Sequence, residues 1–236
     1  MLSVSYIRTV IIFQGEIFMY NYPYGPYYDS LYRETPNYSY IRVFHASPNS
    51  PPVDVYINDK IAVRNLPYRG FSVYLRTAPG SYNVKVFPAG QNVNPVVNTN
   101  LDVPSKAIIT VAAIGTLPNI SLLPIVEPTF PKNPSEAYIR FSQLSPNSPS
   151  LNLELTGAGN LFSNVAYTKT TDYTPINAGT HTFNITTAIN NERVLHVPNV
   201  RLLPNKIYTL YTVGLLGKNP PLQVLIPLDG SSYIKF

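Results

Sequence analysis

A stretch of 17 residues, YIRVFHASPNSPPVDVY at positions 40–56, returns as YIRFSQLSPNSPSLNLE at positions 138–154. The two copies align without a gap, 98 positions apart, which is the length of a whole domain. Similarity at a fixed spacing indicates repeated structural units. The sequence therefore predicts two similar modules in tandem.

The composition of the 236-residue chain favours a β-rich protein with few charges. Charged residues make up 12% of the chain, about half the usual quarter, while 24 prolines and 19 tyrosines are both high counts. The 17 basic and 12 acidic residues give a net charge of +5, but the basic residues are scattered singly. We therefore expect no nucleic-acid partner. Without cysteine there is neither a disulfide nor a cysteine-based zinc site.

Residues 1–18 contain one apolar run, VIIF at positions 10–13. It is too short for a signal peptide or for a membrane span of about 20 residues. The codons for QGE at positions 14–16 can form a purine-rich ribosome-binding site two codons before Met19. Our hypothesis is that the natural start is Met19 and that residues 1–18 are a translated leader. The alternative is a β-strand over residues 5–13.

Segment 19–38 carries closely spaced tyrosines and almost no aliphatic residues: Tyr20, Tyr22, Tyr24, Tyr27, Tyr28 and Tyr32. Such a segment cannot build a core and predicts a disordered or extended tail. Tyrosine gains a large contact area at a small entropic cost, so the tail is a candidate assembly or cross-linking arm. A leader of no consequence is the alternative.

Short runs rich in β-branched and aromatic residues alternate with turn residues through the rest of the chain. Module one, residues 39–127, has candidate strands at 40–45, 53–57, 61–65, 72–76, 82–87, 96–103, 107–114 and 121–125. Module two, residues 136–236, repeats this pattern, and helical periodicity is absent throughout. The expected fold is all-β, with two tandem immunoglobulin-like antiparallel β-sandwich domains.

The linker between the modules, residues 128–135, contains three prolines. Prolines keep a segment extended and semi-rigid, so we expect the modules to hold a defined relative position. Phe130 is expected to pack at their junction.

His45 and Asp54 form the one pairing that suggests catalysis or metal binding. One imidazole and one carboxylate fall short of the ligands that a zinc site needs. We expect both side chains to hydrogen-bond to the turn at 47–50 and to hold its shape. Because no nucleophile, base and orienting group occur together, we expect no enzyme activity and no cofactor.

Module one resembles a bacterial family of domains of unknown function, DUF4397. The residues that carry this resemblance are IRVFHASP at 41–48, VDVY at 53–56 and the PGSY turn at 79–82. Module two departs from the pattern with Gln143 in place of His45 and Asn152 in place of Asp54. The resemblance implies an immunoglobulin-like β-sandwich of bacterial surface and envelope proteins, with no established activity. The tyrosine-rich tail is similar to tails of spore-coat proteins.

These features predict a structural protein of a bacterial cell surface, spore coat or exosporium. It would associate with itself and with other coat proteins through the tail and through exposed strand edges. The alternative is a surface adhesin or carbohydrate-binding module with a glycan partner. In that case Tyr68, Phe71 and Tyr74 would form a stacking platform.

Overall fold

The computed structural model describes residues 6–13, 16–23 and 37–236, with side chains from residue 37 onward. The chain divides into two compact units, residues 1–37 and 38–236, and each is described on its own.

The first unit contains an antiparallel pair of strands, β1 (Tyr6–Phe13) and β2 (Glu16–Pro23). The expected alternative of a strand near residues 5–13 is present as β1. Tyr20 and Tyr22 belong to β2, whose backbone runs through Met19, while Tyr24, Tyr27, Tyr28 and Tyr32 lie outside the described residues. A natural start at Met19 stays a prediction.

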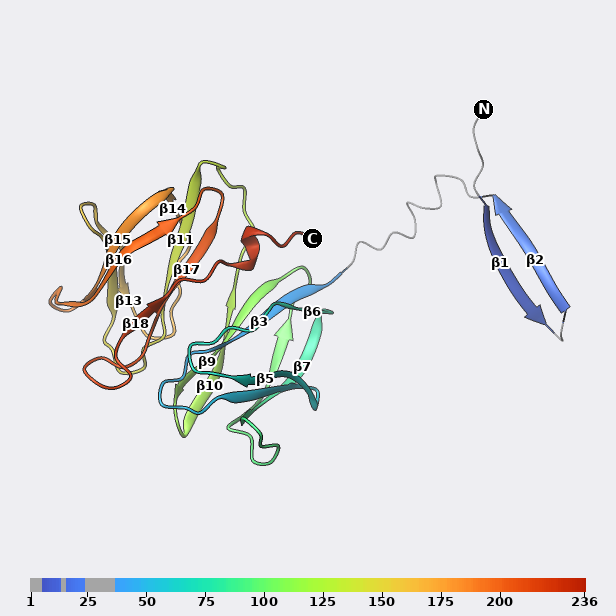
Figure 1. Cartoon of the computed structure of the whole chain (residues 1–236), viewed down its shortest axis with the longest axis horizontal. Coiled ribbons are helices and arrows are strands. Elements are labelled where there is room, and N and C mark those ends of the chain that lie inside the picture. The colour runs from blue at the N-terminus through green and yellow to red at the C-terminus, as the bar shows by residue number, and fades with distance from the viewer. Residues whose placement is uncertain (1–5, 14–15, 24–36) are drawn as a thin grey trace. The chain divides into compact units, whose positions relative to one another are not determined.

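The second unit is all-β and consists of four four-stranded sheets in two halves (Figure 1). The strands of the first half are β3 (Ser39–His45), β4 (Val53–Ile57), β5 (Lys60–Leu66), β6 (Leu75–Thr77), β7 (Gly80–Pro88), β8 (Val97–Val103), β9 (Ile108–Thr116) and β10 (Asn119–Val126). Those of the second half are β11 (Glu136–Gln143), β12 (Leu151–Leu155), β13 (Gly159–Val165), β14 (Thr174–Asn177), β15 (Gly179–Thr187), β16 (Arg193–Leu202), β17 (Ile207–Val213) and β18 (Gln223–Leu225). A short 3-10 helix, η1, spans Gly230–Ser232. Among the described residues, no helix is long and apolar enough to cross a membrane.

Each half is an immunoglobulin-like sandwich with the same strand order. One sheet is β5-β4-β7-β8 in the first half and β13-β12-β15-β16 in the second. The other sheet is β10-β9-β3-β6 in the first half. Its counterpart in the second half, written in the same direction, is β18-β17-β11-β14. The predicted all-β fold is confirmed, and within it one strand pair in each half is parallel, β3 with β9 and β11 with β17. A parallel pair is available here because a whole sheet lies between the two strands in the sequence.

The candidate strand at 72–76 is shorter than predicted, since β6 begins at Leu75. Ser72 donates its N–H to the carbonyl of Val43, and its hydroxyl accepts the N–H of Val43 at 2.8 Å. A side-chain oxygen thus takes the place of a ladder carbonyl, and the regular strand starts only afterwards. Thr171 does the same for Phe141 in the second half.

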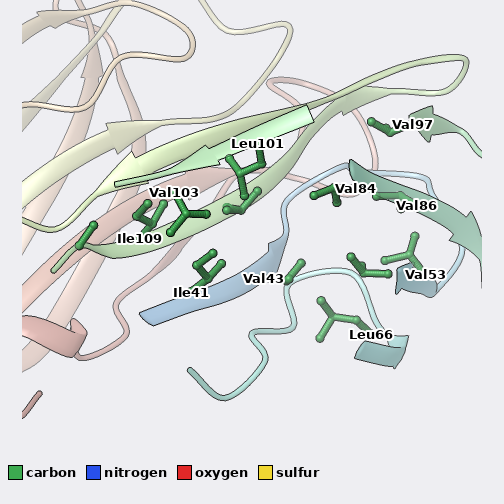
Figure 2. Close-up of a cluster of buried hydrophobic side chains, with 13 residues drawn as sticks. Ile41, Val43, Val53, Leu66, Val84, Val86, Val97, Leu101, Val103 and Ile109 are labelled. Atoms are coloured by element: carbon green, nitrogen blue, oxygen red, sulfur yellow. The ribbon is translucent and has the colours of Figure 1, made fainter. Parts of the chain in front are cut away.

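The four sheets pack on one another as layers through three buried hydrophobic clusters. One cluster fills the first sandwich, where Ile41 and Ile109 of the inner sheet lie near Leu101 and Val103 of the outer sheet (Figure 2). A second fills the other sandwich. The third joins the two inner sheets and consists of Phe44, Ala46, Ala112, Ile114, Ile125, Leu144, Tyr211 and Val213. The two sandwiches therefore stack face to face instead of being joined only by a linker.

The inner strands are consequently buried on both faces. In β3, Ile41 and Val43 point into the first sandwich, whereas Arg42 and Phe44 lie in the junction between the halves. Each fully buried apolar side chain contributes about 1.5–3 kcal/mol. Parting the two halves is correspondingly costly. Phe130 of the linker packs against Tyr138, at 5.1 Å between ring centroids.

Candidate functional site

A cluster of buried charges lies between the two inner sheets. Arg42 of β3 and Arg140 of β11 occupy equivalent positions of the repeat, and each side chain is only 4% exposed. Glu127 directly follows β10, Asp229 directly precedes η1, and both carboxylates are fully buried. Buried charges are stable only when they are paired and hydrogen-bonded.

In the first half, a threonine connects the arginine to the acid. Arg42 Nε donates to Thr110 Oγ1 at 2.7 Å, and the threonine hydroxyl donates to Glu127 Oε1 at 2.6 Å. Tyr74 OH donates to the same carboxylate oxygen at 2.7 Å. The second oxygen, Glu127 Oε2, accepts the N–H of Gly230 at 2.7 Å.

The second half repeats this arrangement with its own residues. Arg140 Nε donates to Thr209 Oγ1 at 2.8 Å, and Thr209 donates to Asp229 Oδ2. Tyr173 OH donates to the same oxygen at 2.7 Å. The ring of Tyr173 also lies under the guanidinium of Arg140, at 4.4 Å from its centroid.

Each arginine also reaches across to the other half. Arg42 donates to Leu228 O and to Asp229 Oδ1, both at 3.0 Å. Arg140 donates to Val126 O at 2.7 Å. These carbonyls belong to the residues just before the two acids, so the exchange is reciprocal. Such reciprocity is the mark of an interface with two-fold symmetry, here within one chain.

The shared carboxylate of Asp229 titrates unusually. Burial, followed by the nearby Glu127 charge, raises its pKa to about 6 although both arginines and the Thr209 hydroxyl favour the charged form. For Arg42, burial lowers the pKa, but the surrounding acids and tyrosines outweigh it and raise the pKa overall. Burial raises the pKa of Tyr211, which lies in the same junction, to about 12.

This cluster binds the two halves together. Both carboxylates are fully buried and the two arginine side chains are 4% exposed, so these groups bond chiefly to one another. Within the described residues, no three histidines or carboxylates converge as metal ligands.

His45 and Asp54, the pair singled out by sequence, hold different loops. The buried His45 donates Nε2–H to Pro51 O at 3.0 Å, and burial lowers its pKa. Asp54 accepts the N–H groups of Asn65 and Gly90 at 2.7 and 2.9 Å, which lower its pKa. The expectation that both bond to the turn at 47–50 is therefore wrong. Small polar groups close that turn themselves, since Ser47 Oγ contacts Ser50 Oγ at 2.7 Å and donates to Gly115 O at 2.7 Å.

Their counterparts in the second half make similar contacts with neutral amides. Gln143 Nε2 donates to Pro149 O at 3.4 Å, and Asn152 Oδ1 accepts the N–H of Asn164 at 2.8 Å. An amide reproduces the geometry without an imidazole or a carboxylate. The two positions therefore serve loop shape.

The predicted stacking platform is not formed. Phe71 stacks on Phe44, at 4.0 Å between centroids, and the Tyr74 hydroxyl is bound to Glu127. Tyr68 is half-buried and its hydroxyl is enclosed. These rings sit in loops as predicted, but two of them belong to the junction, because the inner sheet faces a second sandwich instead of solvent.

The Tyr74 ring, together with rings outside the predicted platform, lines an open groove beside η1. One part, of about 370 Å³, is lined by Tyr40, Arg42, Ser72, Val73, Tyr74, Tyr233 and Ile234. The adjoining part, of about 300 Å³, shares Tyr233 and Ile234 and is lined further by Thr129, Lys132, Ser231, Ser232, Lys235 and Phe236. We call the two parts together the Tyr233 groove.

Sequence reasoning missed the arginine cluster, although one signal was present. Both copies of the repeat place an arginine after Tyr-Ile in the middle of an apolar strand. A strand facing solvent has the same pattern, so the arginines alone do not predict burial. The acids, Glu127 and Asp229, lie outside the repeated stretch.

Comparison with known proteins finds the family described as "Domain of unknown function (DUF4397)", which matches residues 39–154 and 155–232. No curated protein matches the chain. Among solved structures, the chain is similar to a candidate cell adhesion protein from Bacteroides ovatus, at 9% sequence identity and a TM-score of 0.22. The similarity covers 81% of this chain and 96% of that chain. Since the two family matches span most of the residues, the chain belongs to the DUF4397 family.

Proposed function

We propose that this chain is a surface attachment protein, an adhesin that works by binding and not by catalysis. The observation that carries this proposal is the junction. Its charged groups hold two sandwiches as one block, while the Tyr233 groove stays open at the surface. A preorganised block loses little conformational freedom when it binds, which favours attachment to a fixed surface.

Attachment is tested with the full chain coupled to beads. Coated beads should retain bacterial cells under flow, and beads coated with a non-binding globular protein should not. The coupled protein is checked by circular dichroism to remain folded. If folded protein retains no cells, the proposed function is wrong.

A second candidate is self-assembly into a surface layer or spore coat. The outer sheets favour it, because their edge strands β8 and β16 span 7 and 10 residues and each carries exposed residues along its length. An exposed edge can pair with a strand of another chain. The tyrosine-rich segment would add a contact arm.

The assembly candidate is tested by light scattering and negative-stain microscopy of protein starting at Met19, with and without residues 19–37. Polymers that need this segment would support a structural subunit. Monodisperse monomers in both cases would rule out assembly through the segment.

A further inference from the structure

The lysine side of the Tyr233 groove carries positive charge without a paired acid. Lys132 is half-buried, and its Nζ donates to Ser231 O at 3.3 Å. Burial, followed by the charges of Lys206 and Lys235, lowers the pKa of Lys132. Among the described residues, none of these three lysines forms an ion pair. An anion entering the groove would meet the ammonium groups of Lys132 and Lys235, which line it.

The groove also contains a polar group that awaits a partner. Ser231 is only 7% exposed, yet its hydroxyl has no hydrogen-bond partner within the described part of the chain. Buried polar groups are nearly always satisfied, so an unsatisfied one needs an explanation. The Lys132 ammonium donates to the backbone carbonyl of this same residue.

The other side of the groove offers aromatic surface. Tyr233 is 54% exposed and meets the Tyr74 ring edge-on at 6.2 Å between centroids. The ring centroids of Tyr40 and Phe236 lie 6.0 Å apart. Val73, which lines the same groove, is 76% exposed. The C–H faces of a pyranose ring pack well on such rings, whereas a simple inorganic anion gains nothing from them.

We propose that the Tyr233 groove binds an acidic glycan, with a sugar carboxylate at Lys132, Lys235 and the Ser231 hydroxyl and sugar faces on the Tyr233 ring. A neutral glycan would leave the ammonium groups uncompensated, and charge complementarity thus selects the acidic one. This inference deepens the proposed attachment function and rests on it.

The test measures binding of oligogalacturonate to the full chain by isothermal titration calorimetry. Wild type should bind oligogalacturonate but not neutral dextran. The K132A/K235A double variant should bind about tenfold more weakly or worse, since charge-assisted hydrogen bonds are lost. Y233A, which removes an exposed ring, should also weaken binding.

The matched control is K60A/K218A, which removes the same charge from exposed positions outside the groove. It should bind like wild type, and all variants should keep the wild-type melting temperature. The proposal is overturned if wild type does not bind, or if the control loses as much affinity as K132A/K235A. Equal or tighter binding of oligothymidylate or inorganic phosphate would likewise overturn it.

The two proposals can fail separately. If beads carrying K132A/K235A retain cells as well as wild type, attachment stands and the groove is not its site. If wild type binds oligogalacturonate but retains no cells, the site stands and the attachment function is wrong.

Discussion

Replacing Arg42 by methionine tests whether the charge cluster stabilises the junction. Methionine matches the apolar stem of arginine and carries no charge, so the substitution chiefly removes the guanidinium. The variant leaves Arg140 with two buried carboxylates and removes the bonds to Thr110, Leu228 and Asp229. Removing one partner from a buried ion pair costs about 3–5 kcal/mol. For a unit of this size, that loss lowers the melting temperature by roughly 6–20 °C.

The loss should depend on pH in a defined direction. The pKa of Asp229 is already raised to about 6, and without Arg42 it rises further. An acid whose folded-state pKa is raised binds its proton more tightly in the folded state, so folding gains stability as pH falls toward the unfolded value of 3.8. The difference between R42M and wild type should therefore be larger at pH 8 than at pH 5.

The assay is urea unfolding followed by circular dichroism at pH 8, 6.5 and 5. The matched control is R201M, at an exposed arginine of β16, which should stay within about 0.5 kcal/mol of wild type. The reasoning is refuted if the unfolding free energy of R42M at pH 8 stays within about 0.5 kcal/mol of wild type, as for a surface substitution. A large loss that is the same at every pH would refute the role of Asp229.

Three further predictions concern single loops. Burial lowers the pKa of His45 below the usual 6.5, so the stability contributed by its neutral imidazole is lost as pH falls through 6.5, opposite in sign to the contribution of Asp229. H45Q should lack this loss. Unfolding at pH 7.5 and 5 compares H45Q with wild type, and equal slopes would contradict the prediction. D54N should cost about 1–3 kcal/mol, because the new amide turns a donor toward the N–H of Gly90; a denaturation midpoint like that of wild type would count against this. G115A should destabilise far more than G90A, since both glycines have positive φ but only a Cβ at Gly115 would meet a backbone atom, Asn119 O at 2.3 Å; equal melting temperatures would disprove it.

The strands could be predicted because alternation and turn residues agree along the outer sheets. Val53, Val55 and Ile57 of β4 alternate with more polar residues, and β4 has the predicted bounds. In β3 the same alternation hides two different environments. Ile41 and Val43 face the core of the first sandwich, while Arg42 faces the second sandwich. The local sequence pattern of β3 does not predict that a second sandwich packs there.

The candidate site was less predictable because its partners are far apart in sequence. Arg42 is satisfied by Asp229, 187 residues later. His45 and Asp54 attracted notice through their chemical type alone, and each turned out to hold a loop. The groove depends on Tyr233, which lies after the last strand.

The reciprocal junction has a consequence for how the two copies could diverge. A linker of about eight residues holds the halves at a local concentration in the millimolar range, whereas separate modules would meet at micromolar levels or below. This roughly thousandfold difference in concentration corresponds to about 4 kcal/mol of association free energy, which the contacts across the junction need not supply. Because the two halves are fused, the junction surface of one half can change in sequence without a matching change in the other half. The equivalent pairs of the two halves have diverged in this way: Phe44 pairs with Ala112 in the first half, and Ser142 pairs with Tyr211 in the second.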